Sequence, residues 1–285
     1  MIQARNITIT IDRDQKTIVE DFSFTVPDGA KVALIGEEGN GKSTLLKWLC
    51  DPALVEGYAT VAGSASVSGT KGYLAQELPT RERALSVYEY LTSHCDERAM
   101  TPNALARAMK DVGLPFDLAY SDQRMGTLSG GERVKLALAA LLINDCDTLF
   151  LDEPSNDLDL ETLAWLEGFL ASVKKTVLYI SHDEVLLSRT AEAVIHLEMV
   201  RRKKIPRATM ANVPYDEYMR RRDAAMQHQA QVAQFEQKAF QQKKERYLSI
   251  YNAVDHAQAA LTRQDPSTGR LLKKKMHTVM SIGRR

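Results

Sequence analysis

The segment Gly36-Glu-Glu-Gly-Asn-Gly-Lys-Ser-Thr44 constrains the fold of this chain more than any other part of the sequence. It lies between a short apolar run at 31–35, which predicts a buried strand, and a helical pattern at 43–50. Glycines let the backbone curl with its N–H groups pointing inward, and the helix start faces the same point. The segment fits the P-loop pattern and predicts a phosphate site built from Gly36, Gly39, Asn40, Gly41, Lys42, Ser43 and Thr44.

Two side chains of this loop have the chemistry needed for a nucleotide and a metal ion. Lys42 is expected to reach the β- and γ-phosphates of ATP, and Ser43 is expected to hold Mg²⁺. The alternative is a chance glycine-rich turn, but such a turn would not require a buried strand before it and a helix after it. The loop therefore predicts Mg-ATP as the ligand.

Two further apolar runs, at 148–151 and 176–180, also predict buried strands, and helical patterns follow them. Strands that alternate with helices indicate an α/β fold with a mostly parallel sheet. The alternating run at 7–11 predicts a half-exposed antiparallel strand, and the pattern of 84–112 is helical. Because ligands of open α/β sheets bind at the carboxyl ends of strands, polar groups at those ends are candidates for the phosphate site.

Asp152, Glu153 and His182 follow these two strands. A carboxylate at a strand end suits Mg²⁺, so Asp152 is predicted to serve the metal, and Glu153 is predicted to orient or activate the attacking water. His182 is predicted to contact the γ-phosphate. The alternatives are solvated charge at a strand end and a histidine with a structural role only.

A second glycine-containing turn, Leu128-Ser-Gly-Gly-Glu-Arg133, opens the helical pattern at 134–143. A helix start of this kind binds anions, although it could also be only a capping turn. One domain cannot easily bring two such helix ends to one γ-phosphate. The second turn is therefore predicted to serve a nucleotide held by another domain.

The composition changes after Pro214, where a connector at 201–214 ends. Residues 215–261 contain no glycine or proline, and every seventh residue from Met219 to Leu261 is apolar, which is a weak coiled-coil signal. A straight helix of this length would reach about 70 Å. A turn signal at 265–269 and a second helical stretch at 271–285 follow. We therefore expect a helical hairpin that is cut short. The chain is expected to be part of a longer protein or to pair with another chain.

Charge and apolar content narrow the class of protein. Residues 215–285 hold 14 Lys and Arg against 7 Asp and Glu, which favours an anionic partner for this part of the chain. The longest apolar run, 136–143, is too short to span a membrane, and the N-terminus has no signal-peptide pattern, so no membrane insertion and a cytoplasmic location are expected. Cys50, Cys95 and Cys146 have neither disulfide nor metal-ligand spacing and are predicted to be buried thiols.

These motifs, in this order, resemble those of the ATP-binding-cassette (ABC) family: GEEGNGKST, Gln76 in GYLAQE, LSGGER, LFLDEP and SHD. The resemblance covers about residues 1–200. It implies a nucleotide-binding domain with a P-loop core, an antiparallel β subdomain and a helical subdomain, followed here by a long helical-hairpin linker over 215–285. It also implies that the chain is an ATPase that uses ATP and Mg²⁺.

The resemblance assigns roles to matching residues. Glu153 would be the catalytic carboxylate and His182 the γ-phosphate sensor, while Gln76 would join Ser43 and Asp152 at the metal. Asp159 would lie at a dimer interface. Three residues would clamp ATP held by an opposing cassette: Ser129, Gly130 and Gly131.

Within the family, EPSNDLDLETLAWLEGFL and the helical segment after the cassette resemble the ABC-F branch. That branch joins two cassettes by a helical hairpin, binds the ribosome, and acts as a translation or antibiotic-resistance factor gated by ATP. Asp157 departs from the histidine common in this branch. Ile11 lies about where cassettes often stack adenine on an aromatic residue, so the base selectivity stays open.

The resemblance implies two partners: a second cassette, on the same longer chain or in a homodimer, and the ribosome with ribosomal or transfer RNA. Basic residues of the linker suit an RNA backbone, although a solvated helix face is the alternative: Arg220–Arg222, Lys243, Lys244, Arg263, Arg270 and Lys273–Lys275. A transporter ATPase subunit is disfavoured by the long basic helix. A cassette of DNA repair or chromosome organisation is disfavoured because no arm interrupts the motifs between Gly36 and His182.

Overall fold

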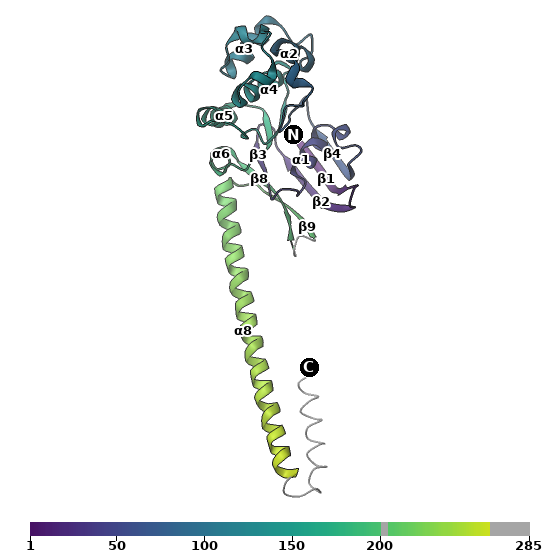
Figure 1. Cartoon of the computed structure of the whole chain (residues 1–285), viewed down its shortest axis with the longest axis vertical. Helices are drawn as coiled ribbons and strands as arrows, with labels where there is room; N and C mark the ends of the chain where they lie inside the picture. The colour runs from purple at the N-terminus through teal and green to yellow at the C-terminus, as the bar shows by residue number, and fades with distance from the viewer. Residues whose placement is uncertain (201–204, 263–285) are drawn as a thin grey trace. The chain divides into compact units, whose positions relative to one another are not determined.

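The computed structural model describes residues 1–200 and 205–262, so the predicted turn at 265–269, the second helical stretch, Arg263, Arg270 and Lys273–Lys275 lie outside the described residues (Figure 1). The chain divides into two compact units, Met1–Met219 and Arg220–Arg285.

A six-stranded sheet forms the centre of the first unit, in the order β5-β6-β7-β3-β8-β9. The first five strands in this order are parallel to their neighbours, and β9 is antiparallel to β8. The bounds are β3 Lys31–Ile35, β5 Lys71–Leu74, β6 Thr148–Asp152, β7 Thr176–Ile180, β8 Ala193–Met199 and β9 Ile205–Ala211. The three buried parallel strands predicted from the sequence are confirmed as β3, β6 and β7.

A second sheet of three antiparallel strands has the order β2-β1-β4. Its strands are β1 Ile2–Ile11, β2 Lys16–Val26 and β4 Ala59–Val67. The predicted antiparallel strand at 7–11 is therefore confirmed and extends back to Ile2. Its alternating pattern arises because one face of this sheet packs on the core while the other meets solvent.

The central sheet separates two hydrophobic cores, and the alternation along each strand decides which core a side chain joins. Val32 and Leu34 of β3 pack with the antiparallel sheet and helix α1 (Lys42–Cys50). Ala33 and Ile35 face the opposite core, which contains α4 (Gly130–Ile143) and α5 (Leu160–Ser172). Strands β3, β6 and β7 are buried along their whole length and apolar between their ends because both faces of the sheet are covered.

The helical pattern of 84–112 is two helices rather than one: α2 Val87–His94 and α3 Pro102–Asp111. Thr101 caps α3 and Pro102 occupies its first turn, where a proline needs no hydrogen-bond partner. Figure 1 shows α2, α3 and α4 gathered at one end of the first unit. Other helices among the described residues of this unit are α6 Glu184–Thr190 and the short 3-10 segments η1 Pro52–Leu54, η2 Glu82–Ala84, η3 Phe116–Tyr120 and η4 Met125–Thr127.

The predicted connector at 201–214 contains strand β9, which sequence reasoning did not foresee. Its burial pattern is mostly intermediate, so it lacks the apolar run that identified the central strands. The start of the next helix also belongs to the first unit, because Tyr215 is buried and the Tyr218 hydroxyl is hydrogen-bonded to His196 Nδ1 at 2.7 Å. The first unit thus extends beyond residue 200.

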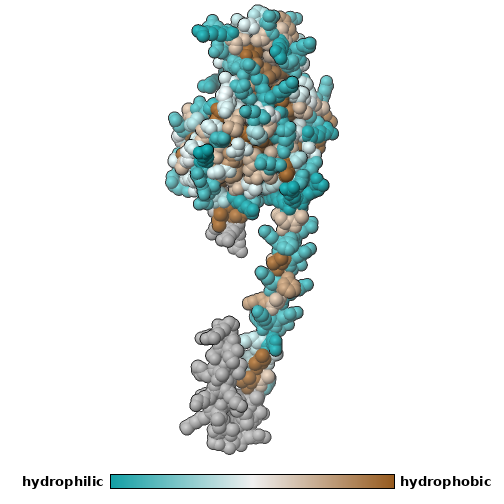
Figure 2. Space-filling model, turned by 180° about the vertical axis from the view of Figure 1, so that it is seen from behind, coloured by the Kyte–Doolittle hydropathy of each residue, from teal (hydrophilic) through white to brown (hydrophobic). Residues whose placement is uncertain are grey.

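Helix α8, Tyr215–Thr262, confirms the predicted long helix. From Arg220 onward it belongs to the second unit, and its large apolar side chains there are exposed, as Phe235 (75%) and Phe240 (69%) show. Figure 2 shows hydrophilic side chains over most of this helix, with separate hydrophobic ones between them. Among the residues that the structure describes, no helix is long and apolar enough to cross a membrane.

Candidate functional site

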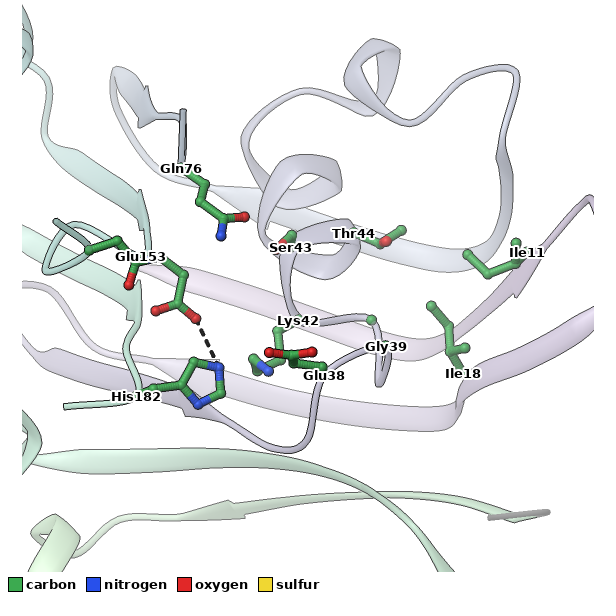
Figure 3. A pocket seen from close by; sticks show the side chains of 12 residues that line it. Ile11, Ile18, Glu38, Gly39, Lys42, Ser43, Thr44, Gln76, Glu153 and His182 are labelled. Carbon is green, nitrogen blue, oxygen red and sulfur yellow. Dashed lines mark ion pairs between the residues drawn. The ribbon is translucent and has the colours of Figure 1, made fainter. Parts of the chain in front are cut away.

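A cavity of about 820 Å³ opens at the carboxyl ends of β3, β6 and β7. The glycine-rich loop forms its floor, and Figure 3 shows Gln76, Glu153 and His182 on one side, with Ile11 and Ile18 on the other. The structure brings together most of the residues predicted for phosphate, metal and catalysis: Gly39, Gly41, Lys42, Ser43, Thr44, Gln76, Glu153 and His182.

The loop is held in place by strand β8. Gly36 has φ 146°, and a Cβ built on it would lie 2.1 Å from the carbonyl oxygen of Leu197, so no other residue fits there. The buried side chain of Asn40 donates from Nδ2 to that same carbonyl at 3.1 Å. Gly36 and Asn40 therefore shape the loop and do not line the cavity.

The amino end of α1 faces the cavity without a side-chain cap. Its N-cap residue is Gly41, with φ 87°, and a Cβ there would clash with the side chain of Ile18 at 2.3 Å. The first backbone N–H groups of a helix need partners from outside the helix, and among the described residues the N-cap side chain supplies none. This uncapped end fits an anion such as a phosphate group.

Lys42 directs its ammonium group to the loop itself. Its Nζ donates to the carbonyl oxygens of Gly36 at 2.7 Å and Glu37 at 3.1 Å. Burial lowers the pKa of Lys42, an effect that the carboxylates of Glu153, Glu38 and Asp152 oppose. The loop thus presents a cation whose three N–H donors are not all used by these two carbonyls.

Asp152, at the end of β6, is only 1% exposed and is hydrogen-bonded through both of its oxygens. Ser43 Oγ donates to Oδ1 at 2.9 Å, and the Tyr73 hydroxyl donates to Oδ2 at 2.9 Å. Burial and the charge of Asp152 raise the pKa of Tyr73, so this phenol keeps its proton. The hydroxyl of Ser43 and the carboxylate of Asp152 are the hard oxygen ligands that suit Mg²⁺.

Glu153 combines a strained backbone with an incompletely satisfied carboxylate. Its φ of 51° is rare outside glycine, and its N–H donates to Ile180 O at 3.1 Å. Oε1 lies 3.1 Å from His182 Nε2, whereas Oε2 is buried and has no hydrogen-bond partner among the described residues (Figure 3). Burial raises the pKa of Glu153, and the nearby His182 and Lys42 oppose this shift. Strain and an orphaned oxygen together are typical of a site that completes its contacts with a ligand or a water.

The opposite side of the cavity is apolar. Ile11 and Ile18 line it across from Glu153 and His182, and Figure 3 shows them on the far side of Gly39. A nucleotide whose phosphates lie at the loop would place its base toward these two side chains. They offer aliphatic contact without hydrogen-bond donors or acceptors.

The Ser129-Gly130-Gly131 turn does not line this cavity. Ser129 caps α4 by a capping box, in which its Oγ accepts from Glu132 N at 3.2 Å. A Cβ on Gly130 would meet the carbonyl of Asp157, and one on Gly131 would meet the side chain of Thr162. Asp159, likewise outside the cavity, caps α5 by accepting from Thr162 N at 2.7 Å. A role for these residues at an opposing nucleotide stays a prediction.

Sequence reasoning missed four residues of the site. Glu38, Ile18 and Asn156 line the cavity, and Tyr73 bonds the Asp152 carboxylate. Tyr73 carried a usable signal, because a tyrosine inside a buried strand normally finds a partner for its hydroxyl. Ile18 carried none, because only the fold brings β2 beneath the loop.

The chain is similar in sequence and in fold to known proteins. A family model described as ABC transporter matches residues 19–156. The ribosome protection protein VmlR of Bacillus subtilis is 32% identical over 67% of this chain and 33% of its own length. The tylosin resistance ATP-binding protein TlrC of Streptomyces fradiae is 33% identical over 67% of this chain and 41% of its own length. The energy-dependent translational throttle protein EttA of Haemophilus influenzae is 31% identical, over 68% and 34% respectively.

The chain spans about a third of the length of these curated relatives, or two fifths for TlrC. Among solved structures, a dimeric bacterial ABC transporter cassette matches with a TM-score of 0.58 and 21% identity, over 73% of this chain and 98% of that one. The same cassette in a post-hydrolysis state with ADP and phosphate matches with a TM-score of 0.57 and 21% identity, over 70% and 97%. At this identity the two structures establish the shared fold.

Proposed function

Because this chain belongs to the ABC transporter family of ATPase domains, in its ABC-F branch, we propose that its cavity binds Mg-ATP and hydrolyses it to ADP and phosphate. The observation that carries this proposal is the state of Glu153. Its carboxylate is buried, is oriented by His182 at 3.1 Å and keeps one oxygen unpartnered among the described residues, at the edge of the phosphate loop. Such an oxygen is suited to accept a hydrogen bond from an attacking water.

The other residues of the cavity would bind the phosphates and the metal ion. The N–H groups of the loop and of α1 would hold the phosphates, and Lys42 would contact the β- and γ-phosphates. Ser43 and Asp152, with Gln76, would hold Mg²⁺, which neutralises phosphate charge when bound. His182 would contact the γ-phosphate while it keeps the Glu153 carboxylate turned toward the cavity.

A second cassette would complete the site. Ser129, Gly130 and Gly131 lie away from the cavity of their own chain, at the amino end of α4, and the N–H groups of a helix amino end suit a phosphate group. We infer that they act on a nucleotide held by an opposing cassette, in the same longer protein or in a homodimer. The dimeric cassettes of the same fold are consistent with this arrangement.

The proposed place of action is the ribosome, in the cytoplasm. The names of two relatives, a ribosome protection protein and a translational throttle protein, point to translation. The second unit adds exposed basic side chains on α8, which suit the phosphates of ribosomal or transfer RNA: Lys238, Lys243, Lys244 and Arg246. Its exposed apolar side chains, among them Phe240 and Tyr247, would pack in a helical hairpin or coiled coil.

The proposal is tested by pelleting ribosomes with the Glu153→Gln protein in ATP or in ADP, because this variant should bind ATP and barely hydrolyse it. Retention with ATP, loss with ADP and weakening by added salt are expected. The Asp152→Asn,Glu153→Gln double variant is the control and should not be retained, because it lacks a metal ligand. No retention in either nucleotide, with ATP binding intact, would overturn the ribosomal role and favour a membrane permease as partner.

A further inference from the structure

The carboxylate of Asp152 is bonded on two sides by residues from two different elements. Ser43, in the first turn of α1, donates to Oδ1, and Tyr73, on the edge strand β5, donates to Oδ2, each at 2.9 Å. Tyr73 does not line the cavity, so it would not touch a nucleotide there. Among the described residues, the hydroxyl of Tyr73 has one hydrogen-bond partner, and that partner is the Asp152 carboxylate.

A buried carboxylate needs this second contact to keep one orientation. The terminal torsion of aspartate is broad, so a single hydrogen bond on one oxygen leaves the carboxylate plane poorly fixed. Donors on both oxygens define the plane. Because Asp152 is 1% exposed, water is poorly placed to replace the phenol if it is removed.

We propose that Tyr73 is a positioning residue for the metal site: its phenol holds the Asp152 carboxylate in the plane that keeps Oδ1 beside Ser43. The inference rests on the proposed Mg-ATP function. It goes further by assigning the geometry of the metal ligands to a residue outside the nucleotide pocket. Partners of this kind, behind a metal ligand, typically change metal affinity about 10- to 100-fold when they are removed.

The chain supplies a matched control. Tyr58 is a second tyrosine near the same carboxylate, and burial raises its pKa too, but it is 38% exposed and its hydroxyl makes no hydrogen bond to Asp152 among the described residues. The variants Tyr73→Phe and Tyr58→Phe therefore remove the same atom from neighbouring places. Only the first removes a donor to Asp152.

The test measures the Mg²⁺ concentration that half-saturates binding of a fluorescent ATP analogue, and the affinity for the same analogue in EDTA. Tyr73→Phe should need about 10-fold more Mg²⁺ with an unchanged affinity in EDTA, while Tyr58→Phe should match the wild type in both. In an Asp152→Asn background, Tyr73→Phe should have no further effect on the Mg²⁺ requirement.

An unchanged Mg²⁺ requirement for Tyr73→Phe would overturn the inference. So would an equal loss of affinity with and without Mg²⁺, because that result describes a general distortion of the fold. If Tyr73→Phe is unstable, Asp152→Asn provides the test, since Tyr73 is proposed to act through that carboxylate. An Mg²⁺ requirement of Asp152→Asn equal to that of the wild type would then overturn the inference. Failure of the proposed function looks different, because the wild-type protein would then bind no analogue in Mg²⁺.

Discussion

The two units of this chain differ in how far their large apolar side chains are exposed to solvent. In the first unit, Phe150 and Tyr179 are fully buried, and the motif residues follow strands that such side chains fix in place. In the second unit, Phe235 is 75% exposed and Phe240 is 69% exposed on a single helix. The first unit therefore has the rigid, self-contained core that catalytic geometry requires, whereas the described helix of the second exposes apolar side chains of the kind that mark interaction sites.

The largest expected effect is a loss of nucleotide affinity when the phosphate loop of the first unit is changed. Lys42→Ala removes the loop's ammonium group and should weaken Mg-ATP binding about 100-fold, because a charge-assisted contact contributes roughly 1.5–3 kcal/mol. Equilibrium titration with a fluorescent nucleotide measures the loss. Lys16→Ala, at an exposed position of strand β2 outside the cavity, is the control and should bind like the wild type. Equal losses in both variants would contradict the assignment of Lys42 to the phosphates.

Changes on helix α8 of the second unit should have the opposite result: they should lower ribosome affinity and leave nucleotide affinity unchanged. Lys243→Glu,Lys244→Glu replaces two exposed cations and should lower ribosome affinity at least about 10-fold, with a shallower dependence on salt, because phosphate contacts release counterions. Nucleotide affinity should not change. Gln241→Ala,Gln242→Ala, next to them on α8, is a neutral control that should leave both properties intact. A helix variant that lost nucleotide binding would break the division between the units.

Within the first unit, the polar phosphate end of the cavity differs from its apolar base end. The base end offers only Ile11 and Ile18 among its described lining residues, so ATP, GTP and CTP should differ in affinity by less than about 5-fold. Ile11→Tyr would add a ring for stacking and should tighten ATP binding about 5-fold or more. Ile11→Leu is the size control. Strong preference for ATP in the wild-type protein would show that a hydrogen-bonding group reaches the base.

The smallest effect concerns stability and pH. Burial raises the pKa of Glu153 above its ordinary 4.5, so the stability this group contributes is greatest below that pH and is lost as pH rises through the higher value. Glu153→Gln cannot ionise and should melt about 2–4 °C above the wild type at pH 8. The difference should shrink as the pH approaches 4.5. A difference that grows on acidification would mean that His182 and Lys42 outweigh burial.

Sequence reasoning succeeded where local pattern and chemistry agree. The strands at 31–35 and 176–180 have the predicted bounds because each is a short apolar run that ends in a motif. The long helix was predictable from the absence of glycine and proline after Pro214. The residues that gather around the loop follow from the rule that parallel strands deliver their carboxyl ends to one edge.

Other features depend on contacts between distant segments. Strand β9 forms because β8 offers an edge to a segment without a strong apolar pattern, and Thr101-Pro102 divides one helical pattern into two helices. Ile18 reaches the loop only because β2 packs below it. The unpartnered Oε2 of Glu153 and the Tyr73 contact are likewise properties of the assembled site.

We propose that the first unit uses Glu153 to hydrolyse ATP. The most direct measurement is phosphate release from saturating Mg-ATP by the wild-type protein and by Glu153→Gln, with bound nucleotide measured in the same samples. The proposed role of Glu153 predicts that release falls by about 100-fold or more while bound ATP is retained, because the variant keeps the phosphate loop and loses the carboxylate that orients water. Release at the wild-type rate, with ATP bound, would contradict it.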